Sequence, residues 1–399
     1  MSSAEARIST IEPPRQSTSV SGWLRRNLFS SWLNTLISLV LLALVGLVLF
    51  TVGRWIFTQA TWRPVIANLR LLMVGLYPVA QIWRVQTVVG LLAASFGLSA
   101  GLRGGLLRYA AMVLAGALVV LAVLPLGLNI QLFWAGMAAL LAIGYLLGRR
   151  APALRLVATI IWLVLPWLSL ALIAGVPGLL TSVPSLSWGG LLLTLILAVF
   201  PIVFSFPIGV LLALGRRSKL PVVRGFCVAY IEIIRGVPLI SVLFMGALLL
   251  PLFINRTPPQ LIRAIVALTL FSAAYLAENV RGGLQAVPRG QEEAAKALGL
   301  NIFQTMFLIV LPQALRAVIP AIVGQFISLF KDTSLVAIIA LNELLGIANS
   351  VIQQREWLGI PGGVQREVLL FVALIYWMFC FSMAQFSRKL EQHLGVGTR

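Results

Sequence analysis

Long apolar runs, separated by short polar segments, dominate this chain. The first run covers Leu33–Val52, and a helix of about 20 residues is ~30 Å long, enough to cross a bilayer. Further runs of similar length lie at 86–102, 109–127, 131–148, 156–175, 186–214, 236–254, 262–280, 312–330 and 367–386. The pattern predicts an all-α polytopic membrane protein with about ten transmembrane helices.

Two stretches of intermediate character interrupt this pattern. Residues 57–84 contain prolines and arginines, and we expect them to lie at the interface without spanning. Residues 333–350 are apolar but include Asn342, Glu343 and Asn349, so we expect a re-entrant or interfacial segment. The polar ends, residues 1–30 and 391–399, are predicted to be cytoplasmic tails.

Composition excludes an ordinary soluble enzyme. Of 399 residues, 60% are hydrophobic and only 10% are charged, whereas soluble proteins carry about 25% charged residues. The net charge of +19 would indicate nucleic acid in a soluble chain, but in a membrane protein it reports topology. With ten spans and a cytoplasmic N-terminus, nineteen of the thirty basic residues fall inside and eight outside. Both termini are therefore predicted to be cytoplasmic, and no nucleic acid partner is needed.

The inventory of reactive side chains is short. Cys227, Cys380 and the single histidine His393 form no spacing typical of a metal site or a disulfide framework. None of the four lysines follows the glycine that a P-loop requires. We therefore expect no catalytic residues, no metal and no cofactor in this chain, and no enzymatic activity of its own.

Polar groups at membrane depth are concentrated after residue 185. Residues 31–185 carry about five predicted spans with almost no polar residue inside them, which is typical of an accessory region. Residues 186–390 contain ionisable groups within or beside their spans, and such groups usually mark a pathway or a buried pair. The sequence therefore predicts that 186–390 is the working half.

A loop at 281–312, predicted to be cytoplasmic, carries the most specific motif. Glu293, Ala294 and Ala295 are followed by three residues and Gly299, and nine residues later by an Ile-x-Leu-Pro segment. The alanines favour a short helix that another protein can approach closely, and Gly299 can adopt positive φ and end that helix. The alternative is an amphipathic helix lying on the membrane surface.

The loop spacing matches the coupling-loop signature of bacterial ABC importer permeases. Segments at 189–221, 230–240, 271–299, 311–320 and 331–335 resemble the polar amino acid family of these permeases. The extended N-terminus resembles the larger permease subunits of broad-specificity or acidic amino acid uptake systems. The resemblance implies that the C-terminal five helices form a type I ABC importer permease core. It also implies a transmembrane permease subunit of an ATP-driven amino acid importer.

The resemblance also implies partners and a location. We expect two ABC ATPase subunits that bind ATP and Mg, a second permease subunit (a paralogue or a second copy) and a periplasmic amino acid binding protein. Glu293, Ala294, Ala295 and Gly299 would couple the chain to the ATPase. The chain would lie in the bacterial cytoplasmic (inner) membrane, surrounded by lipid.

Several polar residues are candidates for a substrate pathway. Ser272, Tyr275, Glu278 and Asn279 share one broad face of a predicted helix and offer acceptors and donors to a zwitterionic amino acid. The alternative for Glu278 is an intrahelical pair with Arg281. Glu232 and Arg235, also three residues apart, are expected to pair with each other.

A second candidate group is Lys331, Asp332, Thr333 and Ser334, which follow an apolar helix. Two charges and two hydroxyls there could contact substrate or form a gate, and the alternative is a capped helix end. An ion-gradient-driven secondary transporter of small polar solutes is the competing function, but it predicts inverted repeats that this sequence does not show. The transported amino acids, and the choice between homodimer and heterodimer, stay open.

Overall fold

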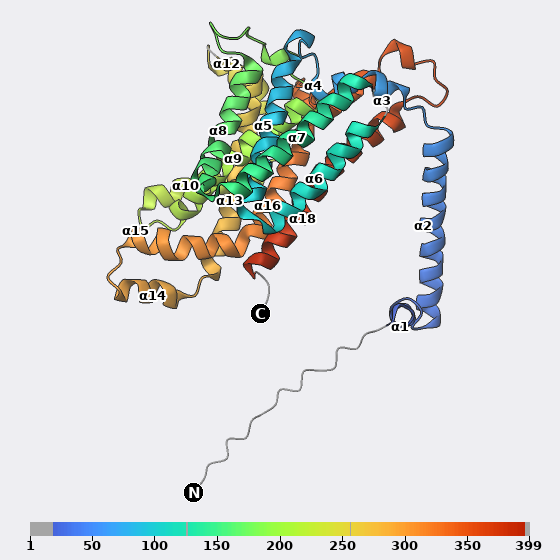
Figure 1. The fold of residues 1–399 in the computed structure, drawn as a ribbon. Coiled ribbons are helices and arrows are strands. Elements are labelled where there is room, and N and C mark those ends of the chain that lie inside the picture. The colour runs from blue at the N-terminus through green and yellow to red at the C-terminus, as the bar shows by residue number, and fades with distance from the viewer. Residues whose placement is uncertain (1–18, 125–126, 256, 396–399) are drawn as a thin grey trace. The chain divides into compact units, whose positions relative to one another are not determined.

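The computed structural model describes residues 19–124, 127–255 and 257–395 and is built from helices (Figure 1). The chain divides into two compact units, Met1–Thr61 and Trp62–Arg399. The helices of the second unit are α3 (Arg63–Ala67), α4 (Leu69–Val74), α5 (Ile82–Arg103), α6 (Gly105–Val123), α7 (Leu128–Arg150), α8 (Arg155–Ala174), α9 (Gly190–Arg216), α10 (Pro221–Gly236), α11 (Leu239–Phe244), α12 (Leu250–Phe253), α13 (Gln260–Ala286), α14 (Arg289–Ala297), α15 (Ile302–Gln304), α16 (Leu311–Asp332), α17 (Leu344–Ile352) and α18 (Gln365–Leu394). Short 3-10 turns cover Val79–Gln81, Pro152–Leu154, Ser185–Ser187, Thr333–Ile339 and Arg355–Trp357, and π-helical turns cover Met245–Leu249 and Thr305–Val310.

The first unit contains α1 (Val20–Asn27) and α2 (Trp32–Thr58). The side chain of Ser31 accepts a hydrogen bond from the backbone N–H of Asn34 at 3.2 Å and so caps the start of α2. No residue of α2 is buried, as befits an apolar helix whose whole surface can face lipid.

The polar ends contain more helix than their composition predicts. Residues 1–18 and 396–399 of the expected tails lie outside the described residues. Within the remainder of the N-terminal segment, α1 forms because Ser19 supplies a side-chain acceptor for the N–H of Gly22. At the other end, α18 continues through Leu394, so the polar residues that follow the last apolar run extend its helix.

The predicted all-α polytopic fold is confirmed. Within the described ranges, nine helical segments are long and apolar enough to cross a membrane, or ten if one bent pair is a single span. That pair joins α10 to the segment Leu239–Phe253 with a bend of 106°. Pro238 explains the break, because proline cannot continue the helix and disfavours helical geometry in the residue before it.

The two stretches expected not to span provide packing for the core. Within them, α3, α4 and α17 lie outside the candidate spans, whereas residues 79–84 and 333–339 fall within the candidate spans Val79–Arg103 and Ile302–Ile339. Leu72 of α4 and Leu344 and Val351 of α17 are fully buried in one apolar cluster. Gly75 adopts a φ of 65°, and a Cβ atom there would lie 2.5 Å from the Cα of Gly189. The segment after α4 thus crosses the start of α9 at backbone contact distance.

One apolar cluster joins the N-terminal and C-terminal helices of the second unit. It contains Tyr77, Val88 and Ile173 together with Leu197 of α9 and Leu268 of α13. The hydroxyl of Tyr77 donates to the carbonyl of Ile173 at 2.8 Å. Other clusters belong to one set of helices alone: two lie within residues 89–161 and one within residues 208–315. The proposed division of labour between 31–185 and 186–390 stays a prediction.

Glycines bring α5 and α7 into backbone contact. Gly97 and Gly101 of α5 face Gly144 and Gly148 of α7, and the four-residue spacing repeats on each helix. A Cβ added at Gly144 would lie 2.2 Å from the carbonyl oxygen of Ala94. Small residues at this spacing allow close approach of membrane helices, where packing rather than the hydrophobic effect drives association.

Alanine substitutions in α7 should have opposite effects at two glycines. Gly144→Ala should lower the free energy of unfolding by about 1–3 kcal/mol, because the helices must separate to admit the methyl group. Gly136→Ala is the control: nothing lies within 4 Å of its added Cβ, so it should raise stability by up to about 1 kcal/mol. Unfolding of the two purified variants in detergent measures both. Equal stability of the two variants would contradict this packing.

Candidate functional site

The loop that follows α13 folds as a helix, a glycine stop and a second capped helix. Gly299 has a φ of 77°. Its N–H donates to the carbonyl of Lys296 at 2.9 Å, and the N–H of Leu300 donates to the carbonyl of Ala295 at 3.1 Å. This pair of bonds is the Schellman motif, which satisfies the last carbonyls of α14. The predicted role of Gly299 as a helix stop is therefore confirmed.

The second helix starts two residues after the stop. Asn301 accepts from the N–H of Gln304 at 2.8 Å, and the side chain of Gln304 accepts from the N–H of Asn301 at 2.9 Å. This capping box fixes the direction in which the chain leaves the loop. Figure 1 shows α14 and α15 beyond the end of the bundle at which α9 and α13 finish.

The loop exposes an apolar surface. The side chains of Leu298, Ile302 and Phe303 are 82%, 75% and 75% exposed. Ala295 is buried, whereas Glu293 and Ala294 are exposed. Of the four candidate coupling residues, Ala295 anchors α14, and the other three, Gly299 included, are exposed.

Glu278 of α13 lies among three arginines from three helices. It accepts from Arg281 of its own helix at 2.7 Å through Nε, and from Arg216 at the end of α9 at 3.3 Å. Arg235 of α10 lies 3.9 Å away. The expected Glu278–Arg281 pair is present, and it is one part of a larger cluster that joins α9, α10 and α13.

The expected pair between Glu232 and Arg235 does not form. Glu232 instead accepts from Arg216 at 3.2 Å, and the guanidinium of Arg235 lies over the ring of Tyr275, 5.6 Å from its centroid. Arg216 is the better partner because the end of α9 lies directly beside α10. A further pair, Arg217–Glu292 at 3.0 Å, connects α9 to α14.

The remaining candidates on α13 occupy different environments. Tyr275 is half-buried and contacts Phe271, with ring centroids 5.0 Å apart. Asn279 donates to the carbonyl of Ala321 on α16 at 3.5 Å, a weak bond. Ser272 is fully buried, so it is removed from any path open to solute in this structure.

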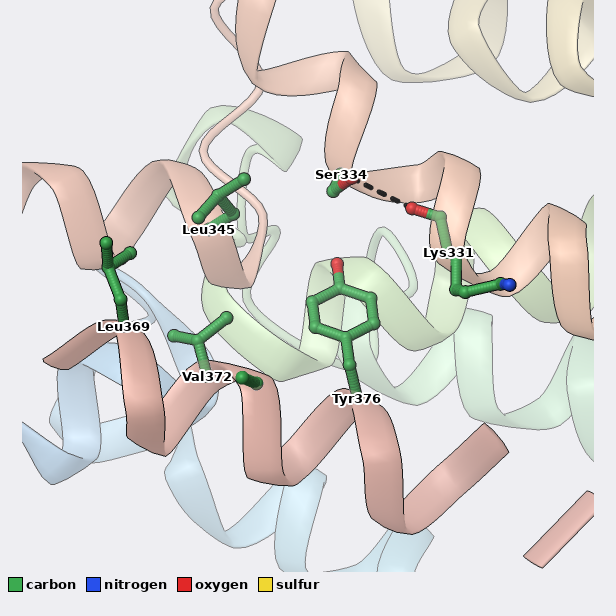
Figure 2. A pocket seen from close by; sticks show the side chains of 7 residues that line it. Lys331, Ser334, Leu345, Leu369, Val372 and Tyr376 are labelled. Carbon is green, nitrogen blue, oxygen red and sulfur yellow. Dashed lines mark hydrogen bonds between the residues drawn. The ribbon is translucent and has the colours of Figure 1, made fainter. Parts of the chain in front are cut away.

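Lys331 and Ser334, two of the four residues of the second candidate group, line a cavity of about 280 Å³ between α16, α17 and α18 (Figure 2). Lys331, Ser334 and Tyr376 supply its polar groups, and the ammonium of Lys331 points away from the tyrosine. Ser334 donates to the carbonyl of Lys331 at 2.9 Å, and Thr333 is buried. Asp332 is half-buried and forms no ion pair with any described residue.

Glu343 is a buried acid that the sequence analysis did not select. It starts α17, and its carboxylate accepts from the N–H groups of Leu345 and Gly346, each at 2.9 Å. The hydroxyl of Tyr376 donates to it at 2.9 Å, and that of Thr194 lies 3.4 Å away. Burial raises the pKa of Glu343, while the four hydrogen bonds act in the opposite direction.

A capping signal could have identified this residue. Asn342 and Glu343 come directly before an apolar helical segment, and an Asn followed by an acid is a signal for the start of a helix. Its contact with Tyr376 could not be inferred, because 33 residues separate the two positions. In the described part of the chain, no group of His, Cys, Asp or Glu side chains could hold a metal ion.

Comparison with known proteins connects this geometry to one family. Residues 205–396 match the family model described as binding-protein-dependent transport system inner membrane component. The inner membrane amino-acid ABC transporter permease protein YhdY of Escherichia coli is 38% identical, over 96% of this chain and 97% of that protein. The glutamate/glutamine/aspartate/asparagine transport system permease protein BztC of Rhodobacter capsulatus is 38% identical, over 93% of each. A crystal structure of an amino acid ABC transporter with histidines covers 51% of this chain and 92% of its own, with 28% identity and a TM-score of 0.46.

Removal of the Glu343 carboxylate should destabilise the fold. Glu343→Ala leaves two backbone N–H groups and the hydroxyl of Tyr376 without their acceptor, at a cost of about 2–4 kcal/mol. Glu343→Gln keeps one acceptor oxygen and should cost less. Glu356→Ala, at an exposed acid, should change stability by under about 0.5 kcal/mol. Thermal unfolding in detergent ranks the variants, and wild-type stability of Glu343→Ala would contradict the structural role.

Proposed function

Because the chain belongs to the family of amino-acid ABC transporter permeases, inner membrane components of binding-protein-dependent transport systems, we propose that it forms the translocation pathway of an ATP-driven amino acid importer. Its loop at 281–312 couples the pathway to a separate ATPase. The observation that supports this coupling is the α14–Gly299–α15 geometry, which presents an exposed apolar surface beyond the end of the bundle. Family membership weighs against the ion-gradient-driven alternative.

The proposed assembly contains subunits other than this chain. Two ATPase subunits bind ATP and Mg, and each contacts a coupling loop. A second permease, a paralogue or another copy of this chain, completes the pathway, and a periplasmic binding protein delivers the substrate. This chain hydrolyses no ATP itself. BztC is named for glutamate, glutamine, aspartate and asparagine, and we propose polar amino acids of this kind as the cargo.

The proposed orientation places α14 and both termini in the cytoplasm. The count of basic residues supports it, because nineteen lie inside under this topology and eight outside. The ion pairs Arg217–Glu292 and Arg216–Glu278 lie at this same end of the bundle. They are well placed to transmit a displacement of α14 to α9 and α13.

We propose distinct roles for the two candidate pathway groups. Glu278 is already neutralised by arginines, so it serves as a latch between α9, α10 and α13 rather than as an acceptor for the substrate ammonium. Tyr275 and Asn279 flank the latch. Lys331 and Ser334 line the cavity of Figure 2, and the ammonium of Lys331, which forms no ion pair with any described residue, can receive a carboxylate at the edge of this cavity. Asp332 and Thr333 hold the turn that carries them.

Gly299→Asp should uncouple ATP hydrolysis from uptake while leaving the protein in the membrane. An aspartate at a φ of 77° loosens the helix stop and adds charge beside the apolar surface. Gly290→Asp is the matched control, because it adds the same charge to α14 at a glycine without positive φ and with open space around it. Uptake and ATPase activity are measured together in proteoliposomes that hold the complete transporter. Normal uptake by Gly299→Asp would refute the coupling role.

Substitutions at Lys331 and Glu278 should change different kinetic constants of uptake. Lys331→Met should raise the apparent substrate constant by about tenfold, the loss expected for one hydrogen bond to a charged group. Glu278→Gln should lower the maximal rate with little change in that constant, because the latch contacts helices rather than substrate. Lys219→Met, at an exposed lysine outside both groups, is the control. Unchanged kinetics in both test variants would remove these residues from the pathway.

A further inference from the structure

A second cavity, of about 600 Å³, lies at the α14 end of the bundle. Its walls come from the end of α9, from α10, from the end of α13 and from α14. Six of the lining residues are cations, namely Arg216, Arg217, Arg224, Arg281, Arg289 and Lys296. Its two acids are Glu292 and Glu293. The pocket is therefore strongly basic before any partner is considered.

Ion pairs neutralise only half of these cations. Arg216 and Arg281 pair with Glu278, and Arg217 pairs with Glu292. Arg224, Arg289 and Lys296 form no ion pair within the described ranges. Even with Glu232 and Glu278, which pair with lining arginines, counted beside the two lining acids, six cations face four carboxylates. A compact ligand with concentrated negative charge would complement this excess.

The three unpaired cations belong to two walls of the pocket. Arg224 lies on α10, and Arg289 and Lys296 are seven residues apart on α14, so they share one face of that helix. The exposed apolar residues Leu298 and Ile302 do not line the pocket. The pocket thus shares Glu293 with the residues proposed for ATPase coupling but does not include these exposed apolar side chains, and a ligand in it would bridge α10 and α14.

The position of α10 indicates a lipid rather than a soluble anion. Val222, Phe226 and Ile233 are four and seven residues apart, and they are 84%, 68% and 63% exposed along one side of this helix. Arg224 and Val228 line the pocket from elsewhere on the helix. One exposed apolar side is typical of a helix that contacts lipid. The ends of α9 and α13, both candidate spans, line the same pocket.

We propose that this pocket binds the phosphate group of an anionic phospholipid of the inner leaflet, with Arg224, Arg289 and Lys296 as its cationic contacts. Basic pockets between transmembrane helices on the cytoplasmic side suit such headgroups. A bound lipid would hold α14 against α10 and so make coupling sensitive to membrane composition. The inference rests on the proposed function only for the orientation of this end toward the cytoplasm.

Native mass spectrometry of the delipidated full chain tests the proposal. Phosphatidylglycerol should bind saturably and more tightly than phosphatidylcholine. The triple variant Arg224→Gln, Arg289→Gln, Lys296→Gln should weaken phosphatidylglycerol binding by about fivefold for each charge removed, or about a hundredfold in total. The control is Arg103→Gln, Arg108→Gln, Arg150→Gln, which removes the same charge from exposed, unpaired arginines of other helices in the described ranges and should bind as wild type.

Three results would overturn the proposal. The first is wild-type affinity for phosphatidylglycerol in the pocket variant. The second is displacement of the lipid by millimolar inorganic phosphate, which would assign the pocket to a soluble anion. The third is unchanged lipid binding together with loss of the co-purifying ATPase, which would assign the pocket to that protein. Uptake by wild-type proteoliposomes is scored separately, so a failure of the transport function leaves the lipid titration interpretable.

Discussion

The carboxylate of Glu278 lies within 4 Å of three guanidinium groups, and one end of the bundle is organised around it. An isolated charge at the edge of a membrane is costly, and surface ion pairs taken one at a time contribute little. Here the partners come from α9, α10 and α13, so the cluster specifies how three helices meet. Arg216 also pairs with Glu232, which extends the network along α10.

The same end of the molecule carries the loop proposed for ATPase coupling and the basic pocket, and both contact helices of the Glu278 cluster. Arg217 of α9 pairs with Glu292 of α14, so the loop is attached to a helix that takes part in the Glu278 cluster. The side chains of Arg217 and Glu292 are partly exposed to solvent, so water can replace either partner and the ion pair can break and re-form. Within the loop, the Gly299 stop after α14 and the Asn301 capping box before α15 fix the backbone.

The opposite arrangement holds around Glu343. That carboxylate is fully buried, and it accepts from backbone and side-chain donors without any cation. It ties α17 to Thr194 of α9 and to Tyr376 of α18, beneath the cavity that Lys331 lines. The molecule thus combines the hydrogen-bonded Glu343 site near the start of α9 with the ionic Glu278 cluster near the end of the same helix. Such a combination suits a pathway that must open at one place while the rest of the core stays packed.

The sequence by itself determined the spans, the helix stop at Gly299 and the family resemblance of the coupling loop. Each of these depends on local rules: the length of an apolar run, the freedom of glycine at positive φ and the spacing of a continuous motif. Tertiary structure alone decided that Glu232 pairs with Arg216 rather than with Arg235, and that Glu343 meets Tyr376. It also decided that one apolar cluster contains residues of both the N-terminal and the C-terminal helices. Charge partners and packing neighbours depend on which helices lie side by side. Local sequence patterns do not predict that arrangement, because the residues in contact are distant in the chain.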